Sequence, residues 1–167
     1  MAKIVSYITF DGHLRNNLSG FYLSSSDWNV LRDFENIVTR KFGLTPHYEK
    51  GTGFGVSYKC RFYNSKVARF LSSIGVPNGD KMLTPFSVPD WIKRDPRLSR
   101  AYLIIAFQCE GWIHKRRHFD SYAVAIHMNK SEQFLSNGLC LKLLELRLQT
   151  FRFALLICAR TGIKQSP

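Results

Sequence analysis

Apolar and polar residues follow two periods along this chain, the helical period and the two-residue period of strands. Residues 2–10 are mostly apolar and stop before Gly12, which predicts a short buried helix. Residues 13–24 are typical of two strands joined by a turn at residues 16–17 or 19–20. The chain is therefore expected to begin with a helix that leads directly into a hairpin.

A longer helical pattern comes next and is bounded by residues that favour helix ends. Ser26 or Asp27 can cap its start, and Gly43 can end it. A glycine-rich hairpin at residues 46–64 and a short amphipathic helix at residues 65–75 follow. The apolar residues of the long helix recur at helical spacing: Trp28, Leu31, Phe34, Ile37, Val38 and Phe42. The predicted order is αββαββα.

Residues 76–97 hold four of the six prolines, so this segment is predicted to be a linker without regular structure. The pattern then starts again, with a helix at residues 98–111 and a hairpin at residues 112–129 that turns near Asp120. A further helix is expected to begin at Ser131. This restart indicates a diverged tandem repeat.

The restart predicts an α+β protein built from two related halves. Residues 1–75 are expected to form the first αββαββα repeat, and residues 98–167 a second repeat that stops where its second hairpin should begin. The run at residues 139–159 has an apolar stripe at helical spacing, and we expect it to cover the incomplete half as a substitute helix. Its four charged residues exclude a membrane span, because each charge near a bilayer centre costs roughly 2.5–3.5 kcal/mol.

The chain carries a formal net charge of +12 over 167 residues, which favours a polyanionic partner, most commonly nucleic acid. No apolar segment follows a basic start, so no signal peptide is expected. The four cysteines, Cys60, Cys109, Cys140 and Cys158, are scattered and favour reduced thiols. We therefore expect an intracellular protein, in the cytoplasm or an organelle matrix, without a membrane partner.

Two apolar helices each end in an acidic residue followed by a glycine, as Asp11-Gly12 and Glu110-Gly111. If the helices pack side by side about a pseudo-two-fold axis, both carboxylates fall at the same end, where like charges repel. A divalent cation such as Mg²⁺ relieves this repulsion and can activate water for phosphodiester hydrolysis. The glycines allow a sharp turn into the next strand and the approach of a bulky anion.

These two segments, IVSYITFDG at residues 4–12 and LIIAFQCEG at residues 103–111, resemble the motif of the LAGLIDADG homing endonucleases in their monomeric two-repeat form. The proline-rich segment between them looks like the linker of that family, and the resemblance extends from Lys3 to about Asn129. It implies a site-specific double-stranded DNA endonuclease that uses Mg²⁺ or Mn²⁺. It also implies saddle-shaped antiparallel sheets that sit in the DNA major groove.

The resemblance places the catalytic carboxylates at Asp11 and Glu110, which would bind the metal beside Gly12 and Gly111. The truncated second half favours an alternative, a cleavage-deficient protein of this kind that binds DNA or acts on intron RNA as a maturase. An unrelated basic protein with an accidental repeat is the remaining alternative.

Strands are expected to carry the DNA contacts, because a two-stranded ribbon fits the major groove. Lys59, Arg61 and Tyr63 alternate at period two, so they are predicted to share one face. The expected nucleic-acid contacts are His13, Arg15, Asn17, Lys50, Lys59, Arg61, Tyr63, His114, Lys115, Arg116 and Arg117.

Overall fold

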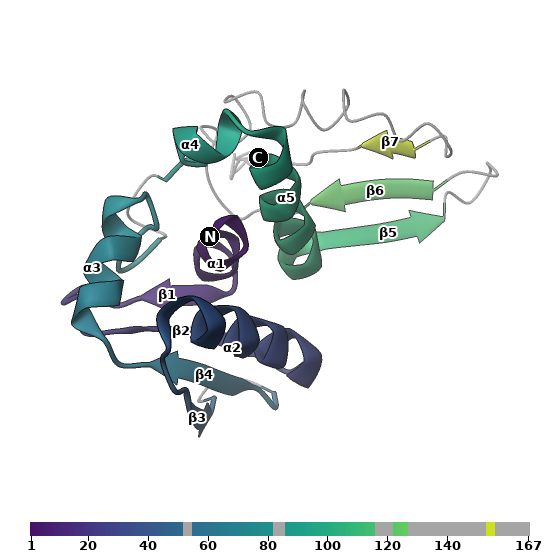
Figure 1. Cartoon of the computed structure of the whole chain (residues 1–167). Coiled ribbons are helices and arrows are strands. Elements are labelled where there is room, and N and C mark those ends of the chain that lie inside the picture. Colours follow the sequence, from purple (N-terminus) through teal and green to yellow (C-terminus); the bar gives the residue numbers. More distant parts are fainter. Residues whose placement is uncertain (52–54, 82–85, 116–121, 127–152, 156–167) are drawn as a thin grey trace, which may run out of the picture.

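The computed structural model of the chain describes residues 1–51, 55–81, 86–115, 122–126 and 153–155. It is an α+β structure in which a four-stranded antiparallel sheet and a three-stranded sheet lie on either side of a pair of helices (Figure 1). The α+β class predicted from the sequence is therefore confirmed.

The first 75 residues contain the predicted helices and strands in the predicted order. These are α1 (Ala2–Thr9), β1 (Gly12–Leu14), β2 (Phe21–Ser25), α2 (Trp28–Phe42), β3 (His47–Lys50), β4 (Tyr58–Phe62) and α3 (Ser65–Ser73). Local signals set their ends. The Asp27 side chain accepts a hydrogen bond of 2.8 Å from the Asn29 backbone N–H, and Gly43 ends α2 with φ of 66°.

The first sheet has the strand order β1-β2-β4-β3, and all its neighbours are antiparallel. Successive strand residues point to opposite faces. One face is buried and apolar, and α1 and α2 pack against it; its strand residues are Leu14, Phe21, Leu23, Cys60 and Phe62. The other face is partly exposed, and the candidate binding residues lie there.

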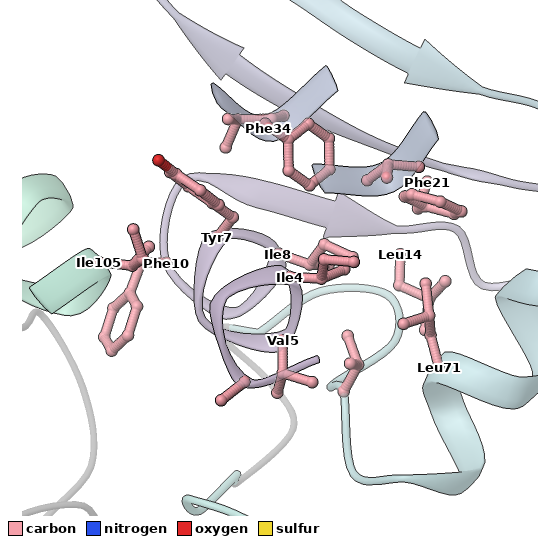
Figure 2. Packing of buried hydrophobic residues seen from close by; sticks show 14 of the residues in the cluster. Ile4, Val5, Tyr7, Ile8, Phe10, Leu14, Phe21, Phe34, Leu71 and Ile105 are labelled. Atoms are coloured by element: carbon pink, nitrogen blue, oxygen red, sulfur yellow. The ribbon is translucent and has the colours of Figure 1, made fainter. Parts of the chain in front are cut away.

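The core is centred on α1, whose side chains are buried on nearly every side. Figure 2 shows side chains from α1, β1, β2, α2 and α3 gathered around this helix. Phe34 of α2 lies at the centre of an aromatic cluster, with its ring centroid 5.6 Å from Tyr7, 6.4 Å from Phe21 and 5.9 Å from Phe62. Burial of these rings fixes α1 and α2 on the sheet.

The second helix beside α1 is α5 (Pro96–Glu110), and the two helices run in the same direction. The Ser6 hydroxyl donates a 2.7 Å hydrogen bond to the backbone carbonyl of Tyr102, and both residues are fully buried. Small Ser6 thus allows close contact between the helices. The predicted side-by-side packing of the two motif helices is confirmed.

The prediction that residues 76–97 hold no regular element is wrong. A short helix, α4 (Asp90–Lys93), follows Pro89, and α5 begins at Pro96. Proline is compatible with the first turn of a helix, because the N–H that it lacks has no partner there. Asp95 caps α5 by accepting hydrogen bonds from the backbone N–H groups of Arg97 and Leu98.

The second sheet has the order β5-β6-β7, from β5 (Gly111–Lys115), β6 (Tyr122–Ile126) and β7 (Phe153–Leu155). The β5–β6 pair is the hairpin expected after α5. The third strand corrects the helix predicted across residues 139–159, because β7 pairs in parallel with β6. The predicted turn at Asp120 and the helix start at Ser131 lie outside the described residues.

Candidate functional site

The open face of the first sheet carries a cluster of cationic and aromatic side chains. Strand pairing places His13 opposite Tyr22, and Tyr22 opposite Arg61. Arg61 lies opposite His47, and Lys59 opposite Glu49. Because paired residues point to the same side, these side chains form one continuous surface across the four strands. We call the seven strand residues on this side the open face: His13, Tyr22, Ser24, His47, Glu49, Lys59 and Arg61.

Tyr22 is the centre of this surface. The Lys59 ammonium lies 5.4 Å from the Tyr22 ring centroid and the Arg61 guanidinium lies 5.1 Å from it. The His13 ring is 5.4 Å from the same centroid. Cations at this distance are attracted by the electron-rich ring face. Lys59, Arg61 and His13 are therefore grouped around one aromatic ring.

Arg61 connects this centre to the edge strand β3. Its guanidinium forms a 3.0 Å ion pair with Glu49 and donates a 3.2 Å hydrogen bond to the Tyr63 hydroxyl. That hydroxyl donates in turn to Glu49 at 3.3 Å. Arg15 lies 5.9 Å from the Tyr63 ring, so it borders the same surface.

Five of the predicted contacts lie together on or beside the open face: His13, Arg15, Lys59, Arg61 and Tyr63. Lys50 does not lie on the open face. It is paired with Tyr58, whose ring packs on Trp28 of α2, so both residues are on the opposite face of the sheet. Asn17 lies in the β1–β2 turn, where its side chain accepts a hydrogen bond from the Ser19 N–H. His114 and Lys115 belong to β5, and Arg116 and Arg117 lie outside the described residues.

Sequence reasoning missed Tyr22, Glu49 and His47. The strand pattern already placed Tyr22 between the apolar residues Phe21 and Leu23, which indicates a side chain on the opposite face. No local signal fixed the register between β3 and β4, so Glu49 and His47 could not be assigned to this surface.

A second cluster lies where α1 and α5 end. The Cys109 thiol is hydrogen-bonded to the Asp11 carboxylate, and burial raises the pKa of Cys109, so the thiol stays protonated and donates. Burial also raises the pKa of Asp11, whereas the Cys109 hydrogen bond and the Lys81 charge lower it. The negative charges of Asp11 and Glu110 both raise the pKa of Lys81, although burial, the largest effect, lowers it, so the two predicted carboxylates lie within electrostatic range of one ammonium group.

Lys81 links this cluster to the end of α1. Its ammonium donates to the backbone carbonyl oxygens of Ile8, Thr9, Phe10 and Gly12, at distances of 2.7–3.2 Å. Ile8 and Thr9 belong to the last turn of α1, where carbonyl groups have no partner within the helix. A cation at a helix C-terminus also interacts favourably with the helix dipole. Lys81 was not among the sequence candidates.

The two glycines of the acid–glycine pairs have a packing role. A Cβ on Gly12 would lie 2.6 Å from the Ile8 Cα and 2.7 Å from the Tyr22 carbonyl oxygen. A Cβ on Gly111 would overlap the ring and carbonyl of Phe107. Neither of these two glycines has a positive φ. Close approach of the backbone, rather than an unusual turn, therefore accounts for glycine at both positions.

The two clusters adjoin each other at the start of β1. Asp11 lies two residues before His13 of the open face. Burial lowers the pKa of His13, and the charges of Lys81 and Arg15 lower it further. His13 is thus neutral at pH 7, and the positive charge here belongs to the lysine and arginine side chains.

The chain is similar to a tRNA-splicing ligase, RtcB of Methanopyrus kandleri. The two are 24% identical over an alignment 151 residues long, and the match covers 82% of this chain and 15% of the relative. No protein-family model matches the chain. The chain thus spans only a small share of the length of the ligase.

This comparison contradicts the interpretation of the chain as a LAGLIDADG homing endonuclease. The similar protein is named for tRNA splicing and ligation, and not for DNA cleavage. The predicted metal-dependent hydrolysis of DNA is therefore corrected, and the alternatives of a cleavage-deficient family member or an intron RNA maturase gain no clear support. Packing accounts for small residues in both motifs. Ser6 lies at the contact between α1 and α5, Gly12 lies against Ile8 and the Tyr22 carbonyl of β2, and Gly111 lies against Phe107 of its own helix.

In the part of the chain that the structure describes, no helix combines the length and the apolar character that crossing a membrane requires.

Proposed function

We propose that the chain binds nucleic acid through the open face of the β1-β2-β4-β3 sheet. The observation that carries this proposal is the arrangement of Lys59 and Arg61 around Tyr22, on a sheet whose other face is filled by the core. The net charge of +12 supports it, because cationic side chains release counterions when they contact phosphates. The tRNA in the relative's name is compatible with the same class of ligand.

The geometry favours contacts to phosphates and base edges over stacking on bases. Stacking needs an aromatic ring with an open surface. Three side chains already surround Tyr22, as the distances from His13, Lys59 and Arg61 show. Tyr63 is 54% exposed, but its hydroxyl is held by Arg61 and Glu49. A folded nucleic acid, such as a duplex or a hairpin, therefore fits this surface better than an unstructured strand.

We extend the proposed surface to the hairpin after α5. An antiparallel pair, β5–β6, follows α5 directly, as β1–β2 follows α1. This correspondence supports the proposal of two related halves. In this proposal, Lys115 of β5 and its sequence neighbours Arg116 and Arg117 would add positive charge, and His114 would add a polar contact.

Charge removal tests the proposal directly. We expect the double variant Arg15→Ala, Lys59→Ala to bind about tenfold more weakly, because each side chain contacts phosphate in the proposed complex. The slope of log K against log salt should flatten by about two units, one for each cationic side chain removed. Fluorescence anisotropy over a salt series, with a mixed-sequence DNA duplex and an RNA hairpin as probes, measures both quantities.

The matched control removes the same charge from α2, with Arg32→Ala and Arg40→Ala. Both residues are exposed and lie on a helix that covers the opposite face of the sheet. The control should bind with nearly the wild-type slope. Equal losses in both double variants would show that net charge, rather than the open face, drives binding. Wild-type protein that binds neither probe would refute the proposal.

We also propose a weak divalent-metal site at Asp11 and Glu110. The described residues contain no group of three histidine, cysteine or acidic side chains suited to a metal, so water or a phosphate would supply the remaining ligands. We expect Mn²⁺ or Mg²⁺ to bind with a dissociation constant on the order of 10⁻³ M, and Asp11→Asn or Glu110→Gln to remove this binding. Calorimetric titration measures it, with Asp90→Asn as the control. A wild-type titration indistinguishable from that of Asp11→Asn would contradict the site.

A further inference from the structure

Glu49 is the one carboxylate among the seven described strand residues of the open face. A carboxylate opposes binding to a phosphate, because the two negative charges repel. Glu49 lies opposite Lys59 on the neighbouring strand. Attraction of a polyanion does not explain why a carboxylate occupies this position. A carboxylate on a surface that binds nucleic acid can favour a base that offers hydrogen-bond donors.

The Glu49 side chain is held in one position from two sides. Arg61 contacts one carboxylate oxygen at 3.0 Å, and the Tyr63 hydroxyl donates to the other at 3.3 Å. His47 lies 3.8 Å from the oxygen that accepts from Tyr63. The Glu49 side chain remains 34% exposed, whereas that of Arg61 is only 14% exposed. The Glu49 carboxylate is thus partly exposed to solvent, and the more buried Arg61 guanidinium contacts it from the side of the sheet.

Arg61 is suited to this supporting role. Its planar guanidinium lies between the Tyr22 and Tyr63 rings, with centroid distances of 5.1 and 5.7 Å. Its Nε is buried and has no hydrogen-bond partner among the described residues. No hydrogen bond from Nε therefore competes with the contact between the guanidinium and Glu49. A lysine would keep the charge but lose the planar shape and the stacking.

We propose that Glu49 selects cytosine on the bound nucleic acid and that Arg61 is the residue that positions Glu49 for this. The proposal rests on the nucleic-acid-binding function above. An ionised carboxylate has acceptors only, so it accepts from the N4 amino group of cytosine. On the major-groove edge it repels the O6 of guanine and the O4 of thymine or uracil, which are acceptors, and the N7 acceptor beside the N6 amino group makes adenine a weaker partner than cytosine. Glu49 therefore contributes discrimination, and the cations around it contribute affinity.

The experiment is selection from two randomised pools, a DNA duplex pool and an RNA pool with a randomised hairpin loop. Wild-type protein should yield sites with one position at which cytosine is preferred about tenfold over the keto bases, the order of discrimination for a direct base contact. Glu49→Gln should reduce this preference to less than about twofold, because an amide both donates and accepts. Its affinity for arbitrary sequences should equal or exceed that of wild type, because a negative charge is gone.

Arg61→Lys gives a second, independent variant. It should lose most of the cytosine preference, because lysine keeps the positive charge but not the planar group that supports Glu49. Asp90→Asn removes one negative charge from an exposed residue of α4 and should leave the preference unchanged. Thermal melting followed by circular dichroism checks that each variant is folded.

The outcomes separate this inference from the proposed function. Salt-dependent binding without a preferred cytosine, or the same preferred cytosine in wild type and Glu49→Gln, would overturn the role of Glu49 and leave binding by the open face intact. A Glu49→Gln protein that binds every sequence more weakly would show a structural role only. Loss of binding by wild type to both pools would overturn both proposals.

Discussion

Replacing Phe34 with alanine is expected to lower the free energy of unfolding by about 3–5 kcal/mol. The Phe34 ring is fully buried and packs against three other aromatic rings, from α1, β2 and β4. Its removal leaves a cavity at the junction of α1, α2 and the sheet, and this junction also supports the open face. Domains of this size are typically stable by only about 5–15 kcal/mol, so the decrease is a large share of the total. Urea unfolding followed by circular dichroism measures it.

Phe70→Ala is the matched control. Phe70 is 45% exposed on α3 and packs against one ring, that of Phe42, among the aromatic pairs of the described residues. Its truncation should cost less than about 1 kcal/mol. Similar decreases in both variants would contradict the placement of Phe34 at the centre of the core.

Local sequence signals were sufficient for the first half of the fold because its elements are bounded by residues with strong local effects. The Asp27 cap and the Gly43 stop defined α2, and helical spacing correctly predicted that Phe34 faces the core. The same reasoning failed for residues 76–97. A high density of proline argues against helix interiors, whereas Pro89 and Pro96 stand at helix starts, the positions at which proline is tolerated.

The site was less predictable because its contacts join distant parts of the chain. The sequence grouped Lys59, Arg61 and Tyr63 correctly by strand period, but it assigned Lys50 to the same surface without knowledge of the β3–β4 register. Tyr22 and Glu49 join that surface only through the pairing of β2 and β3 with β4. Lys81 reaches carbonyl groups 69–73 residues away, which no local pattern reveals.

The functional prediction failed for a related reason. The two acid–glycine segments resemble a family motif whose small and apolar residues are also what two closely packed helices require. In this structure Ser6 lies at the contact between the two helices, whereas each glycine is accounted for by close contacts with its own helix and, for Gly12, with β2. The motif therefore predicted the helix pair correctly, but it did not by itself determine a chemical activity. The role of the region where α1 and α5 end is tested more directly through its charged side chains, Lys81, Asp11 and Glu110.

Lys81→Met is the variant that examines that end, and we expect it to lower the free energy of unfolding by about 3–5 kcal/mol. Methionine keeps much of the length of the side chain but removes the ammonium. Four carbonyl oxygens at the end of α1 and the start of β1 then lose this donor, and Asp11 and Glu110 lose a nearby positive charge. Lys3→Met is the control, because Lys3 forms a 3.9 Å pair with Asp33 at the surface and should contribute no more than about 1 kcal/mol.

A double variant identifies which partner of Lys81 matters more. If repulsion between the two carboxylates causes the destabilisation, Asp11→Asn should recover part of the stability in the Lys81→Met background, giving an interaction energy of about 1–2 kcal/mol in the double-mutant cycle. If the unpaired carbonyl groups cause it, the two changes should be additive, and the end of α1 should lose protection in hydrogen exchange. Urea unfolding of the four proteins measures the cycle. A Lys81→Met protein as stable as Lys3→Met would show that the ammonium does not hold α1, Asp11 and Glu110 together.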